Sequence, residues 1–298
     1  MKQLGLKIDV DTYRGTREGV PCLVEMLTRH IAQATFFFTL GPDHTGRAIM
    51  RVFRSGFIGQ LSRTFVLEHY GLKTLLYGTF LPAPDIGRSC AAILRSVRDA
   101  GFETGVHCYD RVRWQSRVTG KNAQWTQREM QRAVDRYTEI FGVPPTAHAA
   151  AGWQMNRQAL RLTQGFGFNY SSDTRGIHPY IPTWDAEIVA CPQLPTTLPT
   201  LDEIIGRGGV TPDNAAQHLL QLTENQPVTG HVFTLRAELE GGKWKAVFER
   251  LLSGWKEQGY ELVSLSQYQK NIKGVLPRHE VTTGSVEGRS GTVAMQGI

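Results

Sequence analysis

Residues 4–12 of this chain, Leu-Gly-Leu-Lys-Ile-Asp-Val-Asp-Thr, constrain its fold and its chemistry more than any other stretch. Apolar residues alternate from Leu4 to Val10, which predicts a β-strand. The strand ends in Asp9 and Asp11, and because residues two apart on a strand share a face, both carboxylates can point into one site. Two neighbouring carboxylates require a cation, a shared proton or open water. The stretch therefore predicts either a metal ligand beside a general base, or a solvated strand end followed by a turn.

The composition is that of a globular protein with a basic net charge. The chain has 298 residues, of which 41% are hydrophobic and 20% are charged, enough for one large α/β domain or two smaller ones. No run of about eighteen apolar residues predicts a spanning helix, and the N-terminus has no signal-peptide pattern. Four scattered cysteines without zinc-type spacing indicate free thiols in a reducing cytoplasm. The net charge of +6 favours an anionic partner, but no nucleic-acid motif is present, so we expect no nucleic acid.

Predicted strands and helices alternate along most of the chain. Strand-like runs occupy residues 4–10, 34–40, 102–106, 146–152, 166–172, 231–235 and 260–263. Helix-like periodicity occupies residues 20–30, 86–100, 125–141, 157–165, 211–223 and 243–258. The alternation predicts a single α/β barrel-like domain over residues 1–276. Residues 277–298 contain Thr, Gly and Ser and are expected to form a weakly ordered tail.

A basic stretch without acidic residues covers positions 44–67, inside a longer segment, 44–84, that we expect to be an insertion. Its apolar residues recur at a spacing of about four, which is typical of an amphipathic helix. One interpretation is that the stretch lies on an anionic membrane or covers a lipid-linked substrate. The other is an ordinary surface helix whose apolar face packs on the core. The first interpretation predicts membrane contacts from Arg47, Arg51, Phe53, Arg54, Phe57, Leu61 and Arg63.

Six short motifs occur in a fixed order along the chain. They are Asp9-Val-Asp11, Gly105-Val-His107 with Asp110, Ala149-Ala-Ala-Gly-Trp153, Ser172-Asp-Thr-Arg-Gly176, Pro195-Thr-Thr-Leu-Pro-Thr200 with Asp202-Glu203, and Ala237-Glu-Leu-Glu-Gly241. Each motif is weak alone, but together, over residues 4–265, they resemble the polysaccharide deacetylase family, which has a NodB-type domain. Within that family they more closely resemble the branch that deformylates 4-deoxy-4-formamido-L-arabinose-phosphoundecaprenol during lipid A modification.

The resemblance implies an α/β fold, namely a distorted (β/α) barrel of about seven strands. It also implies a divalent metal cofactor, either zinc, manganese or cobalt. The reaction would be hydrolysis of the formamide of an undecaprenyl-phosphate-linked aminosugar, a step toward polymyxin resistance. The location would be peripheral, at the cytoplasmic face of the bacterial inner membrane, with segment 44–84 facing an anionic membrane surface.

The resemblance also implies a role for individual residues. Asp9 would be the base that activates water, and Asp11 and His107 would bind the metal. The family's second histidine ligand falls on Arg111, and its general-acid histidine falls on Arg236. The substrate-binding positions would be Asp110, Trp153, Asp173, Arg175 and Glu238.

The two arginines cannot perform the roles of the histidines that they replace. A guanidinium group stays protonated at neutral pH and has no lone pair for a metal ion. We expect the site residues to converge at one end of the barrel. We further expect Arg111, alone or with Arg236, to pair with Asp11 or Asp110 and to crowd the metal position, because a guanidinium matches a carboxylate well.

Two functional hypotheses follow from these replacements. The chain is either a metal-dependent hydrolase of the lipid-linked sugar, or a catalytically impaired barrel that still binds this anionic ligand. The first hypothesis needs a substitute ligand, for which His148 and His231 are the candidates because they lie on motif-bearing strands.

Overall fold

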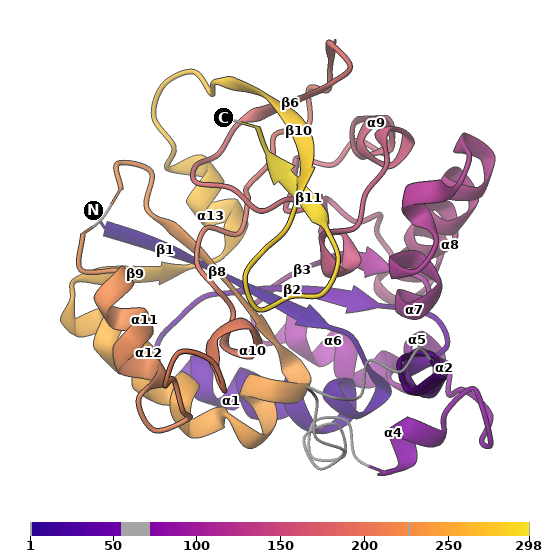
Figure 1. Cartoon of the computed structure of the whole chain (residues 1–298), viewed down its shortest axis with the longest axis horizontal. Coiled ribbons are helices and arrows are strands. Elements are labelled where there is room, and N and C mark those ends of the chain that lie inside the picture. The colour runs from indigo at the N-terminus through magenta and orange to yellow at the C-terminus, as the bar shows by residue number, and fades with distance from the viewer. Residues whose placement is uncertain (1, 55–71, 226, 298) are drawn as a thin grey trace.

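Seven parallel strands form the main sheet of the protein (Figure 1). The computed structural model describes residues 2–54, 72–225 and 227–297. The strand order is β5-β4-β3-β2-β1-β8, and β9 pairs with the first half of β1. The strands are β1 (Lys2–Val10), β2 (Thr35–Thr39), β3 (Glu103–Cys108), β4 (Ala147–His148), β5 (Tyr170–Ser171), β8 (His231–Arg236) and β9 (Tyr260–Val263). The predicted α/β fold with about seven strands is confirmed.

β1 is an interior strand of this sheet, and both of its faces are buried. It pairs in parallel with β2, β8 and β9. Its apolar side chains, such as Leu6 and Ile8, join the large hydrophobic core beneath the helices. Its alternate residues Lys7 and Asp9 are also buried, on the opposite face. A strand covered on both faces is typical of a parallel sheet wrapped by helices.

The barrel is closed by an irregular segment rather than by a regular strand. Between β5 and β8, residues 193–197 run in an extended conformation. The amide of Leu194 donates to the carbonyl of Ser171 on one side (2.8 Å), and the amide of Thr197 donates to the carbonyl of Val232 on the other (3.0 Å). This irregular closure makes the barrel distorted.

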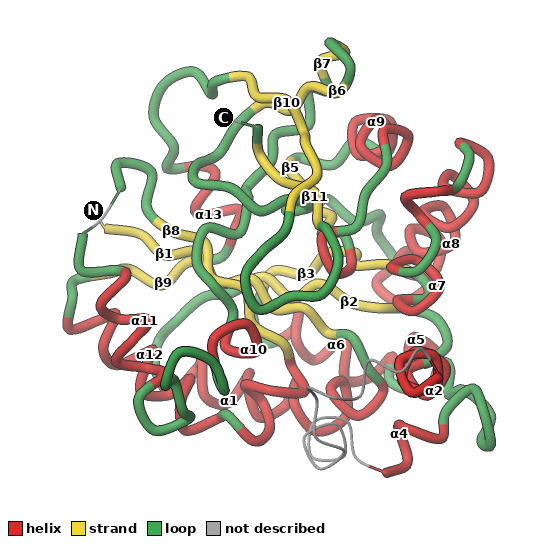
Figure 2. Tube along the Cα trace, viewed as in Figure 1, coloured by secondary structure: helices red, strands yellow, loops and turns green. Residues whose placement is uncertain are grey.

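Helices lie to the left of the main sheet, below it and to its right in the view of Figure 2. Among them, α6 and α8 pack against β3, and α12 packs against β9. The longer helices are α1 (Val20–Arg29), α2 (Thr45–Arg54), α6 (Ala91–Asp99), α8 (Ala123–Phe141), α9 (Arg157–Gly165), α11 (Ala215–Leu222) and α12 (Lys245–Glu257). The shorter ones are α4 (Leu72–Leu76), α5 (Ile86–Ser89), α7 (Arg111–Gln115), α10 (Leu201–Ile204) and α13 (Leu265–Lys270).

The expectation of a weakly ordered tail from residue 277 is wrong. Strands β10 (Arg278–Gly284) and β11 (Val293–Gln296) form an antiparallel pair. β10 also pairs with β6 (Ile181–Trp184), which pairs with β7 (Glu187–Ile188), giving a second sheet of order β11-β10-β6-β7. The strands form because Val281 and Val293 are buried, although polar and glycine residues surround them. This hairpin lies across the barrel (Figure 1, yellow).

The expected insertion, 44–84, is described only in part. Residues 55–71 lie outside the described residues, so the predictions for Phe57, Leu61 and Arg63 do too, as do those for the side chains of Arg51, Phe53 and Arg54. The remainder forms α2 and α4, which pack against each other. None of the helices within the described ranges has the length and apolarity needed to cross a membrane.

Two short π-helical turns follow β1 and β8 and pack against each other through glycines. They cover Gly15–Gly19 and Leu239–Lys243. A β-carbon on Gly19 would overlap the carbonyl oxygen of Ala237, and one on Gly241 would collide with the backbone of Gly19. Only glycine permits this close approach, which fixes the carboxyl ends of β1 and β8 relative to each other.

Candidate active site

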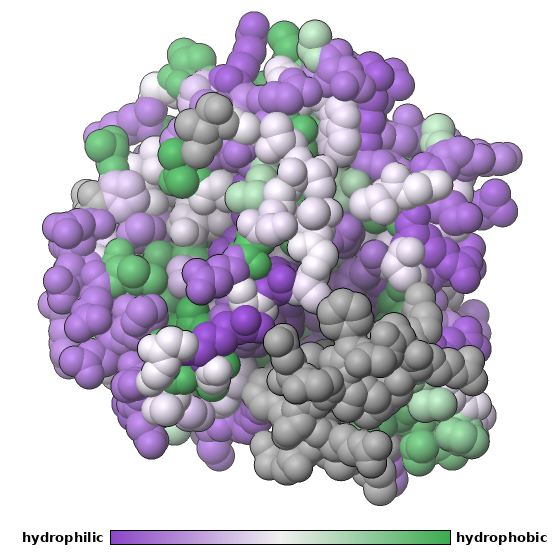
Figure 3. All heavy atoms as spheres, viewed as in Figure 1, coloured by the Kyte–Doolittle hydropathy of each residue, from purple (hydrophilic) through white to green (hydrophobic). Residues whose placement is uncertain are grey.

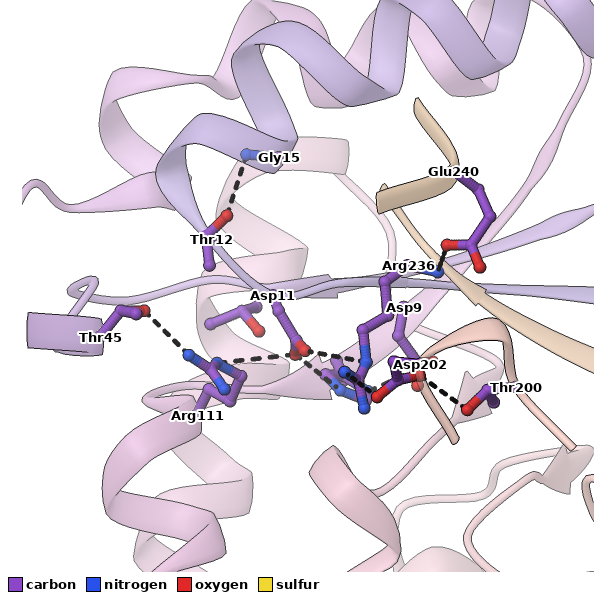
Figure 4. A network of polar contacts seen from close by, with 12 residues as sticks. Asp9, Asp11, Thr12, Gly15, Thr45, Arg111, Thr200, Asp202, Arg236 and Glu240 are labelled. Carbon is purple, nitrogen blue, oxygen red and sulfur yellow. Dashed lines mark hydrogen bonds and ion pairs between the residues drawn. The ribbon is translucent and has the colours of Figure 1, made fainter. Parts of the chain in front are cut away.

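The carboxyl ends of β1, β3 and β8 bring the central residues of the site together (Figure 4). Asp9 is directly opposite Arg236 in the register of β1 and β8. Asp11 follows β1, His107 lies near the end of β3, and Arg111 begins α7. The expected convergence at one end of the barrel is therefore present for these five residues.

Asp11 is surrounded by three nitrogen-bearing side chains. Its Oδ1 lies 3.2 Å from His107 Nε2 and 3.8 Å from Arg111 Nε, and its Oδ2 lies 3.9 Å from Arg236 Nε. Burial acts to raise the pKa of Asp11, but the charge of Arg111, helped by His107 and Arg236, outweighs burial and holds that pKa well below its usual value. Asp11 therefore stays ionised, and its charge is balanced by arginine.

Each guanidinium group beside Asp11 is held by a second partner. Arg111 Nη2 donates to Thr45 Oγ1 at 2.8 Å, and Arg236 Nη1 donates to Asp202 Oδ2 at 2.7 Å. Figure 4 shows Arg111 on one side of Asp11 and Arg236 on the other. A hydrogen bond on one side and an ion pair with Asp11 on the other hold each guanidinium group in place.

Asp9 lies deeper, beside a completely buried lysine. Lys7 Nζ is 3.7 Å from Asp9 Oδ1 and donates to the carbonyl of Ser172 at 2.8 Å. Burial lowers the pKa of Lys7, while the neighbouring charge of Asp9 acts in the opposite direction. The other close group is His107, whose Nδ1 is 3.8 Å from the same oxygen. Asp9 is thus held between two basic side chains.

Several buried polar atoms of this site have no hydrogen-bond partner among the described residues. They are Asp9 Oδ1, Asp11 Oδ1, both ring nitrogens of His107, and Glu238 Oε2. Buried polar atoms in proteins are almost always bonded. A cluster of such atoms at the end of a barrel indicates a place where a ligand or water supplies the missing partners.

Two carboxyl groups beside the arginines are held in the protonated form. Burial, and then the charge of Asp11, raises the pKa of Glu238 to about 8. Burial also raises the pKa of Glu240 to about 8, against the effect of the Arg236 amide, which donates to Glu240 Oε2 at 2.8 Å. Both groups are therefore mostly neutral at neutral pH.

Asp110 and Asp173, which were also expected to bind substrate, form hydrogen bonds within the protein. Asp110 caps α7 by accepting from the amide of Arg113 (3.0 Å) and pairs with His44 Nδ1 (2.7 Å). Asp173 pairs with His148 Nδ1 (2.8 Å). These bonds brace the walls of the site, and the role of these residues toward a substrate stays a prediction.

Trp153 forms a floor beneath three cations. The residue is 1% exposed, and its backbone φ of 55° lies in the left-handed region that non-glycine residues rarely adopt. Lys7 Nζ and the guanidinium carbons of Arg175 and Arg289 lie 5.1, 5.1 and 4.5 Å from the ring centroid. Strained backbone is concentrated at functional sites, which supports a role for Trp153 in shaping this one.

The sequence analysis predicted neither Lys7 nor Arg289 as a residue of this cluster. Arg289 is the more distant of the two in sequence. It comes from the loop between β10 and β11, and its Nη1 lies 3.1 Å from Glu203 Oε1, which also accepts from Arg175 at 2.8 Å. Burial and the charge of Arg236 lower the pKa of Arg289, whereas Asp202 and Glu203 act to raise it. No sequence signal connects residue 289 with the site, because the hairpin that carries it resembles a loop.

The donor set does not fit a divalent metal ion. Only Asp11 and His107 remain of the family's ligands, and within the described ranges no group of three or more His, Cys, Asp or Glu side chains could hold an ion. His148 is engaged with Asp173. His231 pairs with Leu4 at the opposite end of β8 from Arg236, about 16 Å away at the rise of a strand. The hypothesis of a substitute histidine ligand is therefore not supported.

Comparison with known proteins agrees with this architecture. A family model described as Polysaccharide deacetylase matches residues 8–171. A protein of Shewanella sediminis (strain HAW-EB3) named "Probable 4-deoxy-4-formamido-L-arabinose-phosphoundecaprenol deformylase ArnD" is 36% identical over 294 residues, which is 99% of this chain and 94% of that protein.

Two solved structures share the fold at low sequence identity. A protein of Mycobacterium smegmatis provisionally named a polysaccharide deacetylase aligns with a TM-score of 0.63 at 17% identity, covering 96% of each chain. A CE4 family pseudoenzyme of Bacillus anthracis aligns with a TM-score of 0.52 at 14% identity, covering 94% of this chain and 70% of the other. A mutant of that pseudoenzyme is described as having restored enzymatic activity. The fold of this chain is therefore one that solved structures also have.

Proposed function

Since this chain belongs to the polysaccharide deacetylase family, whose members here carry names of amide hydrolases, we propose that it hydrolyses the formamide of undecaprenyl-phosphate-linked 4-deoxy-4-formamido-L-arabinose. The products would be formate and the free aminosugar lipid used in lipid A modification. The observation that carries this proposal is the 36% identity to a protein so named over 99% of the chain. The grouping of Asp9, Asp11 and His107 supports it.

Asp9 is suited to be the base of this reaction. Its Oδ1 is buried and has no hydrogen-bond partner among the described residues, so it can accept a proton from a water molecule that attacks the formyl carbon. The positive charges of Arg111 and Arg236 lie on the same side of the barrel and would stabilise the oxyanion that forms. The carbon–nitrogen bond then breaks, the departing nitrogen takes up a proton from solvent water, and Asp9 releases its proton to solvent.

We expect the reaction to be slow. Arg236 stands at the position of the proton donor, but a guanidinium does not release its proton near neutral pH. Loss of a positioned general acid costs about 10² or more in rate. The site is therefore better arranged to remove a proton from water than to protonate the leaving amine.

The substrate is lipid-linked, so we place the protein at the cytoplasmic face of the inner membrane. The turn after α4 carries Phe80, 77% exposed, and Leu81, 39% exposed. Arg47 Nε donates to the carbonyl of Gly78 in the same turn (2.6 Å), so a cation accompanies the exposed apolar pair. Figure 3 shows one face of the protein, on which hydrophobic residues occur among hydrophilic ones.

The membrane part of the proposal is tested by flotation with vesicles. Binding to vesicles that contain anionic lipid should exceed binding to neutral vesicles and should fall as salt rises, because surface attraction is screened. Phe80→Ser should weaken binding, while exposed Ile31→Ser, on the loop after α1, should not. Equal binding to both lipids at all salt concentrations would remove the electrostatic part of the proposal.

The enzymatic part is tested with the formamido-sugar lipid itself. The purified full chain is incubated with this lipid in detergent, and formate and free amine are both quantified. Release of the two products in equal amounts supports the proposal, and the acetamido analogue tells whether formyl is preferred over acetyl.

A second function, binding without turnover, is favoured by one observation. Arg111 and Arg236 stand where the family carries a metal ligand and a proton donor, and both pair with Asp11. Such a protein would bind the lipid-linked sugar and release no amine. Saturable binding measured by flotation, without formate in the same samples, would select this second function.

A further inference from the structure

The arginine pair at Asp11 has a consequence beyond the choice of substrate. We propose that the guanidinium groups of Arg111 and Arg236 take the place of the divalent ion at this centre, so that the folded protein carries its positive charge there without a bound metal. The inference concerns the centre itself and holds whichever sugar is the ligand.

The site has too few donors for a divalent ion. Among the described residues, a divalent ion at this position would find one carboxylate, Asp11, and one imidazole, His107, and no third protein ligand. Structural zinc sites use four protein ligands and catalytic ones use three. Two ligands leave affinity far below that of a resident cofactor, because each further ligand must come from water.

The charges of the two arginines beside Asp11 also oppose a divalent ion. Arg111 Nε and Arg236 Nε lie 3.8 and 3.9 Å from the two different oxygens of Asp11. An incoming divalent ion would have to approach a carboxylate whose charge is already balanced by two permanent cations. Like charges at such short range repel strongly where the groups are largely buried, so each arginine opposes the ion as well as failing to bind it.

Both arginines are also anchored beside Asp11 by hydrogen bonds to other residues. Arg111 is anchored by Thr45 on α2 (2.8 Å) and Arg236 by Asp202 on α10 (2.7 Å). Both side chains are largely buried, at 11% and 15% exposed. Moving either group aside for an ion would break its anchoring bond and expose Asp11 at the same time.

The test measures metal content directly. The full chain is incubated with Zn²⁺, Mn²⁺ or Co²⁺, desalted, and analysed for bound ion, beside Arg111→His and Arg111→His/Arg236→His. We expect the unmodified protein to retain about a tenth of an ion per chain or less. Arg111→His should raise occupancy roughly tenfold, and the double variant should raise it further.

Two control variants keep the result interpretable. Arg113→His changes an arginine on the same helix that pairs with Glu129 instead (3.1 Å) and should leave metal content unchanged. Arg111→Gln removes the charge without adding a ligand and should remain poor in metal. Adding each ion or a chelator to the unmodified protein should leave its melting temperature unchanged, a readout that needs no variant.

Either of two results would overturn the inference. One is a nearly stoichiometric ion in the unmodified protein that Asp11→Asn removes. The other is a folded Arg111→His protein, with an unchanged circular dichroism spectrum, that stays as poor in metal as the parent. Neither outcome bears on the proposed function, which depends on release of formate, so the two proposals can fail separately.

Discussion

Two of the acid–histidine pairs in this barrel, Asp173–His148 and Asp11–His107, differ in how fully they are hydrogen-bonded. Asp173 binds His148 at 2.8 Å and also accepts from the amide of Ala150 (2.7 Å) and from Gln193 (3.1 Å). Asp11 lies 3.2 Å from His107, yet Asp11 Oδ1 and both ring nitrogens of His107 have no hydrogen-bond partner among the described residues.

The two pairs show the difference between a polar group that stabilises the fold and a polar group that is available to a ligand. A buried carboxylate whose bonds are all made within the protein contributes to stability and has nothing left for a ligand. A buried carboxylate with bonds left open costs stability and is retained where a ligand completes it. Burial alone would not distinguish the pairs, because Asp173 and Asp11 are 0% and 6% exposed.

The largest effect on activity is expected for Asp9→Asn, which removes the proposed base and nearly preserves the shape of the side chain. We expect formate release to fall by about 10² to 10⁴, because an amide cannot accept the proton of water. The rate is measured by formate and amine release from the formamido-sugar lipid. The exposed carboxylate change Asp213→Asn is the matched control, and an unchanged rate in Asp9→Asn would mean that another group is the base.

The contribution of the Asp173 hydrogen bonds to stability is tested by Asp173→Ala. The change leaves His148, the amide of Ala150 and Gln193 without their acceptor, and each buried polar group left without a partner costs about 1–3 kcal/mol. The free energy of unfolding is measured with urea. A cost under about 1 kcal/mol, the range of surface pairs, would show that the network is not structural.

Restoring the two histidines sharpens the comparison from the other direction. In the presence of added metal ion, Arg111→His/Arg236→His should increase formate release by about 10². Arg111→His alone should recover metal more than turnover, because the proton donor is still missing. The reverse order, with turnover restored by Arg236→His alone and without metal, would show that the donor was the sole defect.

A pH-dependent effect concerns the neutral carboxyl of Glu240. Its pKa is raised to about 8 in the folded protein, so its contribution to stability is full below its unfolded pKa and is lost as pH rises through about 8. Between these values the loss is about 1.4 kcal/mol per pH unit. Glu240→Gln cannot ionise, so its advantage in unfolding free energy over the parent should grow with this slope from pH 5 to 7.5.

Exposed Glu261→Gln serves as the control for that series and should show no slope. Comparing each variant with the parent at every pH cancels the groups that titrate in both, among them Glu238, whose pKa is also raised to about 8. A flat difference for Glu240→Gln would place its ionisation near that of an ordinary carboxyl.

The parts of this molecule that could be predicted are those encoded locally. The alternation from Leu4 to Val10 predicts β1, and the motifs that follow β3 and β8 place His107 and Arg236 at the same end of the sheet. The expected pairing of Arg111 and Arg236 with Asp11 is also present.

What could not be predicted depends on contacts between distant segments. Val281 is a single apolar residue in a polar stretch, and Val293 begins a run of only three apolar residues. Both are buried in the structure, where β10 pairs with β6. Arg289 reaches Glu203 across 86 positions of sequence. Likewise, His44 joins Asp110 only because the loop after β2 returns to α7.

The glycine contact between the turns that follow β1 and β8 fixes the backbone of the site independently of the side chains that the site carries. Gly19 and Gly241 set the distance between two backbones, and no side chain at either position can be accommodated. The distance between Asp9 and residue 236 therefore does not depend on which side chain position 236 carries. A lineage can exchange histidine for arginine there, and an engineer can exchange it back, without redesigning the scaffold. In such a fold the chemistry at the end of the barrel can change by single codons while the architecture stays the same.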